Sequence, residues 1–143
     1  MDTFAKVITA YADGSCDPTT NLCTWGVMTK HGTRETKYSG TCKHATDANH
    51  AELEAVLKAI EYCRGIDSRI QIYTDSMYVV DRLKRWLDNP GGFRSSVVWR
   101  RMESAMGGNR EVEVIWAKRG SHPFLIEAHR LAYRKMQRVR VFT

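Results

Sequence analysis

Three carboxylates at separate points in the chain have the clearest potential for chemistry. Asp13 ends a nearly unbroken apolar run, and Asp75 directly follows the alternating segment Arg69–Thr74. Glu52 lies in the first turns of a segment with helical periodicity. Close carboxylates repel one another, so a cluster of them favours a bound cation, and hard oxygen ligands favour Mg²⁺ or Mn²⁺. Two such ions can activate a water for phosphodiester cleavage.

The same acids also have a simpler interpretation. Asp13 is followed by Gly14, and most Asp-Gly pairs belong to turns. The two aspartates could therefore be turn residues, and Glu52 a solvated helix acid. Alternatively, Gly14 permits a close approach that a side chain would block, so that the Asp13 carboxylate can face a bulky ligand.

The elements that would position these acids follow from hydrophobic periodicity. We expect a buried strand within Phe4–Cys16, a hairpin of Cys23–Lys30 and Thr33–Cys42 with an edge as its second strand, and strands at Arg69–Thr74 and Glu111–Ala117. We expect helices from Thr46 or Asp47 to about Cys63, between Asp75 and Asn89, over about Val97–Met106, and from near Pro123 through Met136. This order predicts an α/β fold, because strand-helix-strand crossovers force parallel pairing after an antiparallel start.

Length and composition indicate one globular domain over residues 1–143, with 43% hydrophobic and 27% charged residues. No apolar run is long enough to span a membrane, and no leader segment is recognisable. We therefore expect a cytoplasmic protein without a membrane partner. The net charge of +6 suggests a polyanionic partner, with a solvated basic surface as the alternative.

The cysteines are expected to be reduced thiols. No two of them have the close spacing that chelates zinc, and a chain of this length does not need disulfides for stability. The four are Cys16, Cys23, Cys42 and Cys63.

Several motifs resemble, in order and spacing, the type 1 ribonuclease H family. They are Tyr11-Ala-Asp-Gly-Ser-Cys16, Trp25-Gly26, Asn49-His-Ala-Glu-Leu-Glu-Ala55 and Tyr73-Thr-Asp-Ser-Met-Tyr-Val79, followed by Trp116-Ala-Lys118 and Leu131-Ala132. The family fold is a ribonuclease H-like five-stranded mixed sheet, three antiparallel strands and then two parallel ones, flanked by helices. The resemblance implies a two-metal endonuclease that cuts the RNA strand of RNA/DNA hybrids and leaves 5′-phosphate and 3′-hydroxyl ends.

Matched by position, Asp13 resembles the ligand shared by both metal ions, Glu52 the helix carboxylate and Asp75 the second strand-end carboxylate. Glu54 is not the match, because the family places its acid directly before Leu-x-Ala. Substrate contacts are implied for Gly14, Ser15, Cys16, Asn49 and Lys118. Contacts to 2′-hydroxyl groups would select RNA, and a basic surface would hold the phosphates of the DNA strand.

The last helix departs from the family pattern. The family usually carries a fourth carboxylate just before Leu-Ala, where this chain has His129. Glu127 is a poor substitute, because it falls roughly 200° around a helix from that position. We predict that His129 is a working ligand through its neutral imidazole and shifts the preference toward Mn²⁺, as in distant junction resolvases of the RuvC type. The alternative is a helix histidine with no metal role.

Two further segments also depart from the family. The family loop Lys-Gly-His-x-Gly carries a mobile histidine, whereas Lys118–Pro123 is one residue shorter, so His122 either takes over that role or begins the helix. A Lys-rich handle after the second helix is missing, and weaker, more salt-sensitive hybrid binding is expected. Arg100, Arg101 and Lys84 or Arg85 could supply part of the lost charge.

The sequence therefore predicts a free, monomeric ribonuclease H that uses two Mg²⁺ or Mn²⁺ ions, with Asp13, Glu52, Asp75, His129 and His122 as its catalytic residues. A structure-specific DNA nuclease, such as a junction resolvase, is a second hypothesis and rests on His129. A catalytically weak hybrid-binding module is a third.

Overall fold

A computed structural model describes residues 7–63, 69–106 and 111–142 of the chain. The strands are β1 (Val7–Cys16), β2 (Cys23–His31), β3 (Arg34–Thr41), β4 (Arg69–Thr74) and β5 (Val112–Trp116). The helices are α1 (Ala48–Tyr62), α2 (Met77–Asp88), α3 (Val97–Ala105) and α4 (Pro123–Phe142), with a 3-10 turn η2 (Pro90–Phe93). The part of the predicted first strand before Val7 lies outside the described residues.

The strands form one mixed sheet in the order β3-β2-β1-β4-β5. β2 pairs antiparallel with β1 and β3, whereas β4 pairs parallel with β1 and β5. The predicted α/β fold and the predicted edge position of β3 are both confirmed. Within the described residues, no helix combines the length and the apolar composition that crossing a membrane would require.

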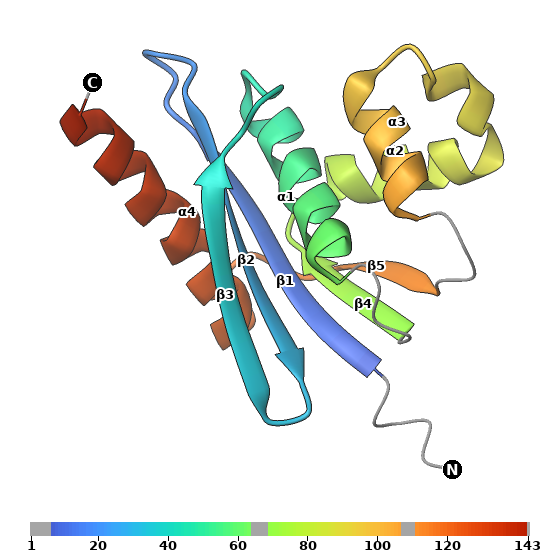
Figure 1. Ribbon diagram of the computed structural model, residues 1–143, viewed down its shortest axis with the longest axis horizontal. Helices are drawn as coiled ribbons and strands as arrows, with labels where there is room; N and C mark the ends of the chain where they lie inside the picture. Colours follow the sequence, from blue (N-terminus) through green and yellow to red (C-terminus); the bar gives the residue numbers. More distant parts are fainter. Residues whose placement is uncertain (1–6, 64–68, 107–110, 143) are drawn as a thin grey trace.

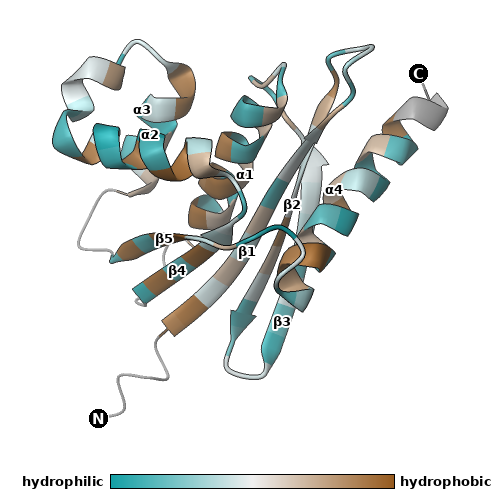
Figure 2. Cartoon of the chain, turned by 180° about the vertical axis from the view of Figure 1, so that it is seen from behind, coloured by the Kyte–Doolittle hydropathy of each residue, from teal (hydrophilic) through white to brown (hydrophobic). Residues whose placement is uncertain are grey.

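Helices cover both faces of the sheet. Figure 1 shows α4 on one side and α1, α2 and α3 on the other. Ala10 and Ala12 of β1 are fully buried between these layers, as are Leu53, Val56 and Leu57 on the inner side of α1. Apolar residues accordingly colour much of β1 and β4 in Figure 2, while apolar and polar residues alternate along α1 and α4.

Side-chain caps begin the helices that border the sheet's carboxyl end. Asp47 accepts a hydrogen bond from the backbone N–H of His50 at the start of α1. Ser76 accepts one from Val79 at the start of α2. Each cap satisfies a backbone donor that the first helical turn leaves unpaired. The Ser76 cap therefore fixes the start of α2 directly after Asp75.

Two glycines let the helix layers come close to the central strands. A Cβ atom at Gly14 would overlap the main chain of Ala51 in α1, and one at Gly26 would overlap the carbonyl oxygen of Ala128 in α4. The predicted close approach at Gly14 is therefore to a helix of the same chain. Such contacts require glycine because the neighbouring atoms are backbone and cannot move aside.

The end of β1 differs from the sequence prediction. Parallel pairing with β4 stops at Tyr11 opposite Tyr73, but antiparallel pairing with β2 continues to Cys16. Asp13 therefore lies within β1, opposite Gly26, and it is only the β4 side of the strand that ends before it. The prediction took the acid as the strand's end because the hydrophobic pattern stops there.

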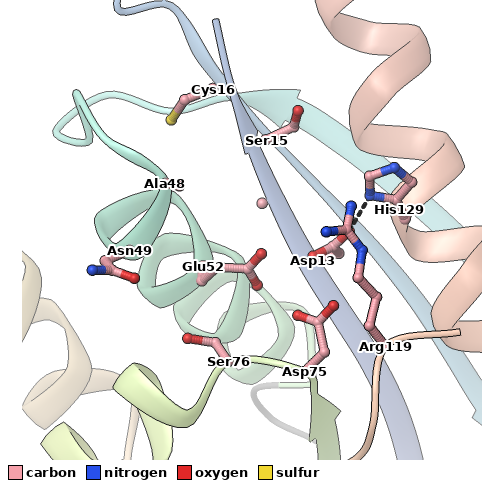
Figure 3. A pocket seen from close by; sticks show the side chains of 11 residues that line it. Asp13, Ser15, Cys16, Ala48, Asn49, Glu52, Asp75, Ser76, Arg119 and His129 are labelled. Atoms are coloured by element: carbon pink, nitrogen blue, oxygen red, sulfur yellow. Dashed lines mark hydrogen bonds and ion pairs between the residues drawn. The ribbon is translucent and has the colours of Figure 1, made fainter. Parts of the chain in front are cut away.

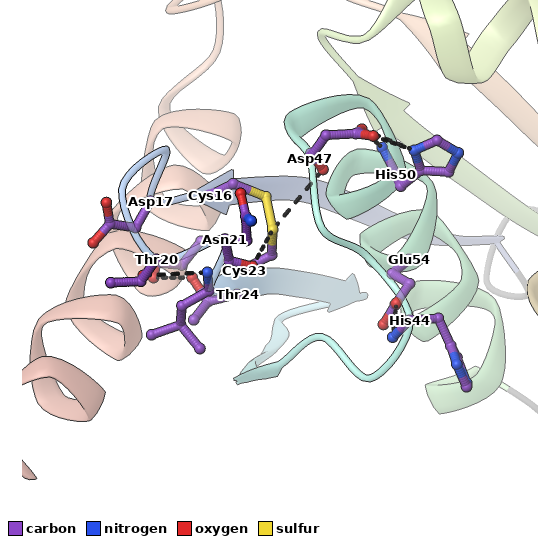
Figure 4. Close-up of a disulfide and its surroundings, with 12 residues drawn as sticks. Cys16, Asp17, Thr20, Asn21, Cys23, Thr24, His44, Asp47, His50 and Glu54 are labelled. Carbon is purple, nitrogen blue, oxygen red and sulfur yellow. Dashed lines mark hydrogen bonds and ion pairs between the residues drawn. A yellow bond between two sulfur atoms is a disulfide. The ribbon is translucent and has the colours of Figure 1, made fainter. Parts of the chain in front are cut away.

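The expectation of four reduced thiols is wrong for one pair. Cys16 and Cys23 form a disulfide, with Cα atoms 4.0 Å apart, at the end of the β1–β2 ladder where residues 17–22 connect the two strands (Figure 4). The two residues face each other in the strand register, which the sequence spacing did not reveal. Cys42 and Cys63 keep the expected thiol form.

Candidate active site

The three acids singled out from the sequence meet in one pocket (Figure 3). Asp13 comes from β1, Glu52 from the first turns of α1, and Asp75 from the residue after β4. Each offers a carboxylate oxygen, and these oxygens all lie within 4.8 Å of one another. The residues that line the pocket are Asp13, Gly14, Ser15, Cys16, Ala48, Asn49, Glu52, Asp75, Ser76, Arg119 and His129. The interpretation as unrelated turn and surface acids is therefore wrong.

Glu52 is strongly perturbed by its surroundings. The pKa of its carboxyl group is raised to about 11, first by burial and then by a hydrogen bond with Asp13 and by the charges of Asp13 and Asp75. A backbone hydrogen bond from Gly14 opposes this rise. The pKa of Asp75 is also raised, first by burial and then by the charge of Asp13. The cluster therefore holds more negative charge than the protein alone stabilises.

The donor set fits a divalent cation. The Oε2 atom of Glu52 is buried and has no hydrogen-bond partner among the described residues. A buried carboxylate oxygen without a partner is costly, and a cation beside it would remove that cost. Three carboxylates with converging oxygens are hard ligands of the kind that Mg²⁺ and Mn²⁺ favour. Asp13, Glu52 and Asp75 could hold such an ion.

His129 lies at the edge of this cluster. Its Nδ1 atom is 2.6 Å from Oδ2 of Asp13. That hydrogen bond raises the pKa of the imidazole, against the opposing effect of burial. Glu127, two residues earlier on α4, instead pairs with Lys37 of β3 at 3.3 Å. The helix therefore brings the histidine, and not the nearby glutamate, to the acids.

The predicted substrate contacts divide into two groups. Gly14, Ser15, Cys16 and Asn49 line the pocket, whereas Lys118 is not among the described residues that line it. The sulfur of Cys16 belongs to the disulfide, so it has no thiol hydrogen to donate. A hydrogen bond donated by this residue to a ligand would therefore have to come from its main chain.

His122 also lies outside the pocket lining. Its ring stacks on Tyr11 with centroids 4.7 Å apart and lies near Phe124 at 5.4 Å. Its Nδ1 atom accepts a hydrogen bond from the backbone N–H of Phe124 at 3.1 Å. Of the two alternatives for His122, this geometry corresponds to the start of the helix.

Glu54 has a structural role and is not part of the carboxylate cluster. It is buried, and its carboxylate accepts hydrogen bonds from the backbone N–H groups of Lys43 at 3.1 Å and His44 at 2.7 Å (Figure 4). It thereby ties the connection between β3 and α1 to the helix. The two glutamates of the same motif, Glu52 and Glu54, thus have different surroundings, although they are only two residues apart in the sequence.

Sequence reasoning missed three lining residues, which are Ala48, Ser76 and Arg119. Ser76 directly follows Asp75 and caps α2, so its place follows from the helix boundary. The signal for Arg119 was its position in the loop after β5, at the same edge of the sheet as Asp75. The prediction considered that loop only for a histidine and for the substrate contact of Lys118.

Comparisons with known proteins agree with this arrangement. The RNase H family model matches residues 5–122. A protein named Ribonuclease H from Parvibaculum lavamentivorans is 30% identical over 141 residues, which cover 91% of this chain and 92% of that protein. Its namesake from Bradyrhizobium diazoefficiens is 29% identical over 137 residues, with 88% of this chain and 87% of that protein covered.

A protein with the same name from Ruthia magnifica is 35% identical over 82 residues, which cover 57% of this chain and 56% of that protein. The family match ends at residue 122, one residue before α4 begins, so His129 lies beyond it. With most of the chain matched by the family model, and with a relative aligned along nearly its whole length, the chain belongs to the RNase H family of enzymes.

Proposed function

We propose that the protein hydrolyses the RNA strand of RNA/DNA hybrids with two divalent metal ions, leaving 5′-phosphate and 3′-hydroxyl ends. The observation that carries this proposal is the convergence of Asp13, Glu52 and Asp75 in one pocket of an RNase H-family chain. We propose further that residues 1–143 act as one domain, as a monomer, and in the cytoplasm.

Within this proposal, Asp13 would be the ligand shared between the two ions, since it is clustered within 4.8 Å of the Glu52 and Asp75 carboxylates and also contacts His129. Two Mg²⁺ or Mn²⁺ ions held there would supply Lewis-acid activation of a water and stabilise the leaving oxygen. Glu52 contributes its buried, unpartnered oxygen to the same cluster. His129 orients the Asp13 carboxylate through its hydrogen bond and, as a neutral imidazole, serves as a further ligand.

Substrate recognition is assigned to the lining residues on the α1 side. Asn49 and Ser15 carry polar side chains, Gly14 and Cys16 offer main-chain polar groups, and all four residues line the pocket. These groups are suited to the 2′-hydroxyl and phosphate oxygens of the RNA strand. Lys118, which is exposed on the neighbouring loop, would contact a backbone phosphate.

The test is a cleavage assay on three labelled substrates, an RNA/DNA hybrid, duplex DNA and a four-way junction, each with Mg²⁺ or Mn²⁺. We expect cleavage of the hybrid's RNA strand, with 3′-hydroxyl ends, and its loss in Asp13→Asn. Preferential cleavage of the junction would support the resolvase hypothesis. Hybrid binding without cleavage in either metal would support the binding-module hypothesis.

A further inference from the structure

The short loop between β5 and α4 is fixed at both of its ends. The backbone N–H of Ala117 donates to the carbonyl oxygen of Thr74 at 2.9 Å, which holds the loop's start beside β4. The backbone N–H of Ser121 donates to the carbonyl oxygen of Lys118 at 3.0 Å, and Gly120 has a positive φ of 76°. These contacts form a tight turn with Arg119 and Gly120 at its centre.

Arg119 is the side chain of this turn that reaches the pocket. Figure 3 shows it extending from the loop toward Asp13 and His129, and it lines the pocket with both. His122 is held in the aromatic contacts at the start of α4, and Lys118 does not line the pocket. The chain thus replaces an imidazole on this loop with a guanidinium.

Arg119 lies close enough to the acids to affect them electrostatically, but within the described part of the chain it forms no ion pair with them. Its positive charge lowers the pKa of both Asp75 and His129. Within residues 7–63, 69–106 and 111–142, no ion pair within 4.0 Å engages its guanidinium. The residue is exposed, so its donors remain available to a ligand that enters the pocket.

The charge balance of the site indicates what that ligand is. The family's fourth carboxylate is an imidazole here, so three carboxylates face the two ions of the proposed function. When a water attacks a phosphodiester, negative charge develops on the phosphate oxygens. A guanidinium at the pocket mouth can hydrogen-bond two such oxygens at once, in a geometry that a lysine ammonium does not reproduce.

We propose that Arg119 is a catalytic residue that binds the scissile phosphate of the RNA strand and stabilises the charge that develops on it during hydrolysis. The inference rests on the proposed function, because it takes the hybrid's RNA strand as the substrate. It gives Arg119 a role at the reacting phosphate, on the loop for which the family resemblance implied a mobile histidine.

The test compares Arg119→Ala and Arg119→Lys with Arg134→Ala, an exposed arginine on α4 that serves as a matched control. We expect kcat on the hybrid to fall about 10²–10³-fold in Arg119→Ala, the usual cost of removing one transition-state donor. KM and the equilibrium affinity for a non-cleavable hybrid should change much less. Arg119→Lys should recover only part of kcat, and added guanidinium ion should partly rescue Arg119→Ala but not Asp13→Asn.

Two outcomes would overturn the assignment. One is a kcat for Arg119→Ala equal to that of Arg134→Ala, and the other is a loss confined to KM and hybrid affinity, as for a general phosphate contact. Unfolding curves for each variant separate these results from misfolding. If the wild-type protein cleaves no hybrid in either metal, the proposed function itself fails, whereas normal wild-type cleavage with an unaffected Arg119→Ala contradicts only this inference.

Discussion

Glu52 shows how one buried acid couples metal binding, stability and pH. Its pKa is raised to about 11 in the folded protein from an ordinary value of 4.5. Folding without metal therefore requires this group to take up a proton at neutral pH. That requirement is absent near the ordinary pKa and grows as the pH rises toward the folded pKa.

We therefore expect Glu52→Gln to raise the free energy of unfolding of the metal-free protein, because glutamine needs no proton. The gain should be close to zero near pH 5 and on the order of 1–3 kcal/mol at pH 8. Urea denaturation in EDTA at both pH values measures it. A gain that is equal at both pH values, or larger at pH 5, would contradict the buried-acid interpretation.

The same residue predicts proton release on metal binding. A carboxyl group that is protonated in the metal-free protein must lose its proton to become a ligand. Calorimetric titration with Mn²⁺ at pH 7, in buffers of different ionisation enthalpy, should show about one proton released per protein molecule. Glu52→Gln should reduce that number. Equal proton release in the two proteins would place the titrating group elsewhere.

His129 provides a separate test at the residue scale. Replacement by alanine removes the hydrogen bond to Asp13, and replacement by aspartate restores the family's fourth carboxylate. If His129 is a ligand, His129→Ala should lower activity by about tenfold or more, within the range typical for losing a group that supports a metal site. His129→Asp should shift the preference from Mn²⁺ toward Mg²⁺. Unchanged activity of both variants in both metals would remove His129 from the site.

At the scale of elements, the glycines of β1 and β2 set how closely the helices approach the sheet. Gly14→Ala would push α1 away from β1, and Glu52 moves with that helix. We expect a loss of about 1–3 kcal/mol in stability, as for other overpacked sites, together with loss of hybrid cleavage. Gly91→Ala in η2 is the control, since its new methyl group would make only ordinary contacts. Equal stability of the two variants would show that the α1 contact is unimportant.

Hydrophobic periodicity predicted the elements well because it records which side of each element meets the core. It identified the helix α1 and the polar edge strand β3. It could not give the extent of β1, because the pairing of Asp13 and Cys16 with β2 depends on strand register. The Cys16–Cys23 disulfide was missed for the same reason.

The site was predictable to the extent that it rests on motifs. Asp13, Glu52 and Asp75 stand in recognisable sequence contexts and do converge. The contribution of Arg119 depends on the conformation of a short loop, which no periodicity describes. The packing of the His122 ring against Tyr11 likewise joins segments far apart in the sequence, and only the fold brings them together.

At the scale of the whole molecule, the disulfide should contribute measurable stability. Cys16 and Cys23 are seven residues apart, and closing a loop of this size stabilises a protein by about 2–3 kcal/mol through the unfolded state. Dithiothreitol should lower the free energy of unfolding by that amount in the wild-type protein and have no effect on Cys23→Ser. If the reductant has the same effect on both proteins, the bond does not contribute in this way.

The absence of the family's Lys-rich handle after the second helix leads to a second prediction at this scale, which concerns the salt dependence of hybrid binding. Arg101 is engaged with Glu61 at 2.7 Å, whereas Lys84 and Arg85 are exposed on α2. If these two hold phosphates of the DNA strand, Lys84→Ala/Arg85→Ala should lower the slope of log affinity against log salt by about 1–2. Fluorescence anisotropy with a non-cleavable hybrid measures that slope. An unchanged slope would place the electrostatic contacts elsewhere on the surface.

The two close approaches at Gly14 and Gly26 have a wider consequence for the chemistry. Gly26 lies opposite Asp13 in the ladder, and Gly14 is the next residue along β1, so α1 and α4 press against the same short stretch of backbone from opposite sides. The span from Glu52 to His129 across the pocket is thereby set by the thickness of the sheet. Substitutions that loosen the apolar layers elsewhere should lower the melting temperature well before they alter the spacing of the reacting groups.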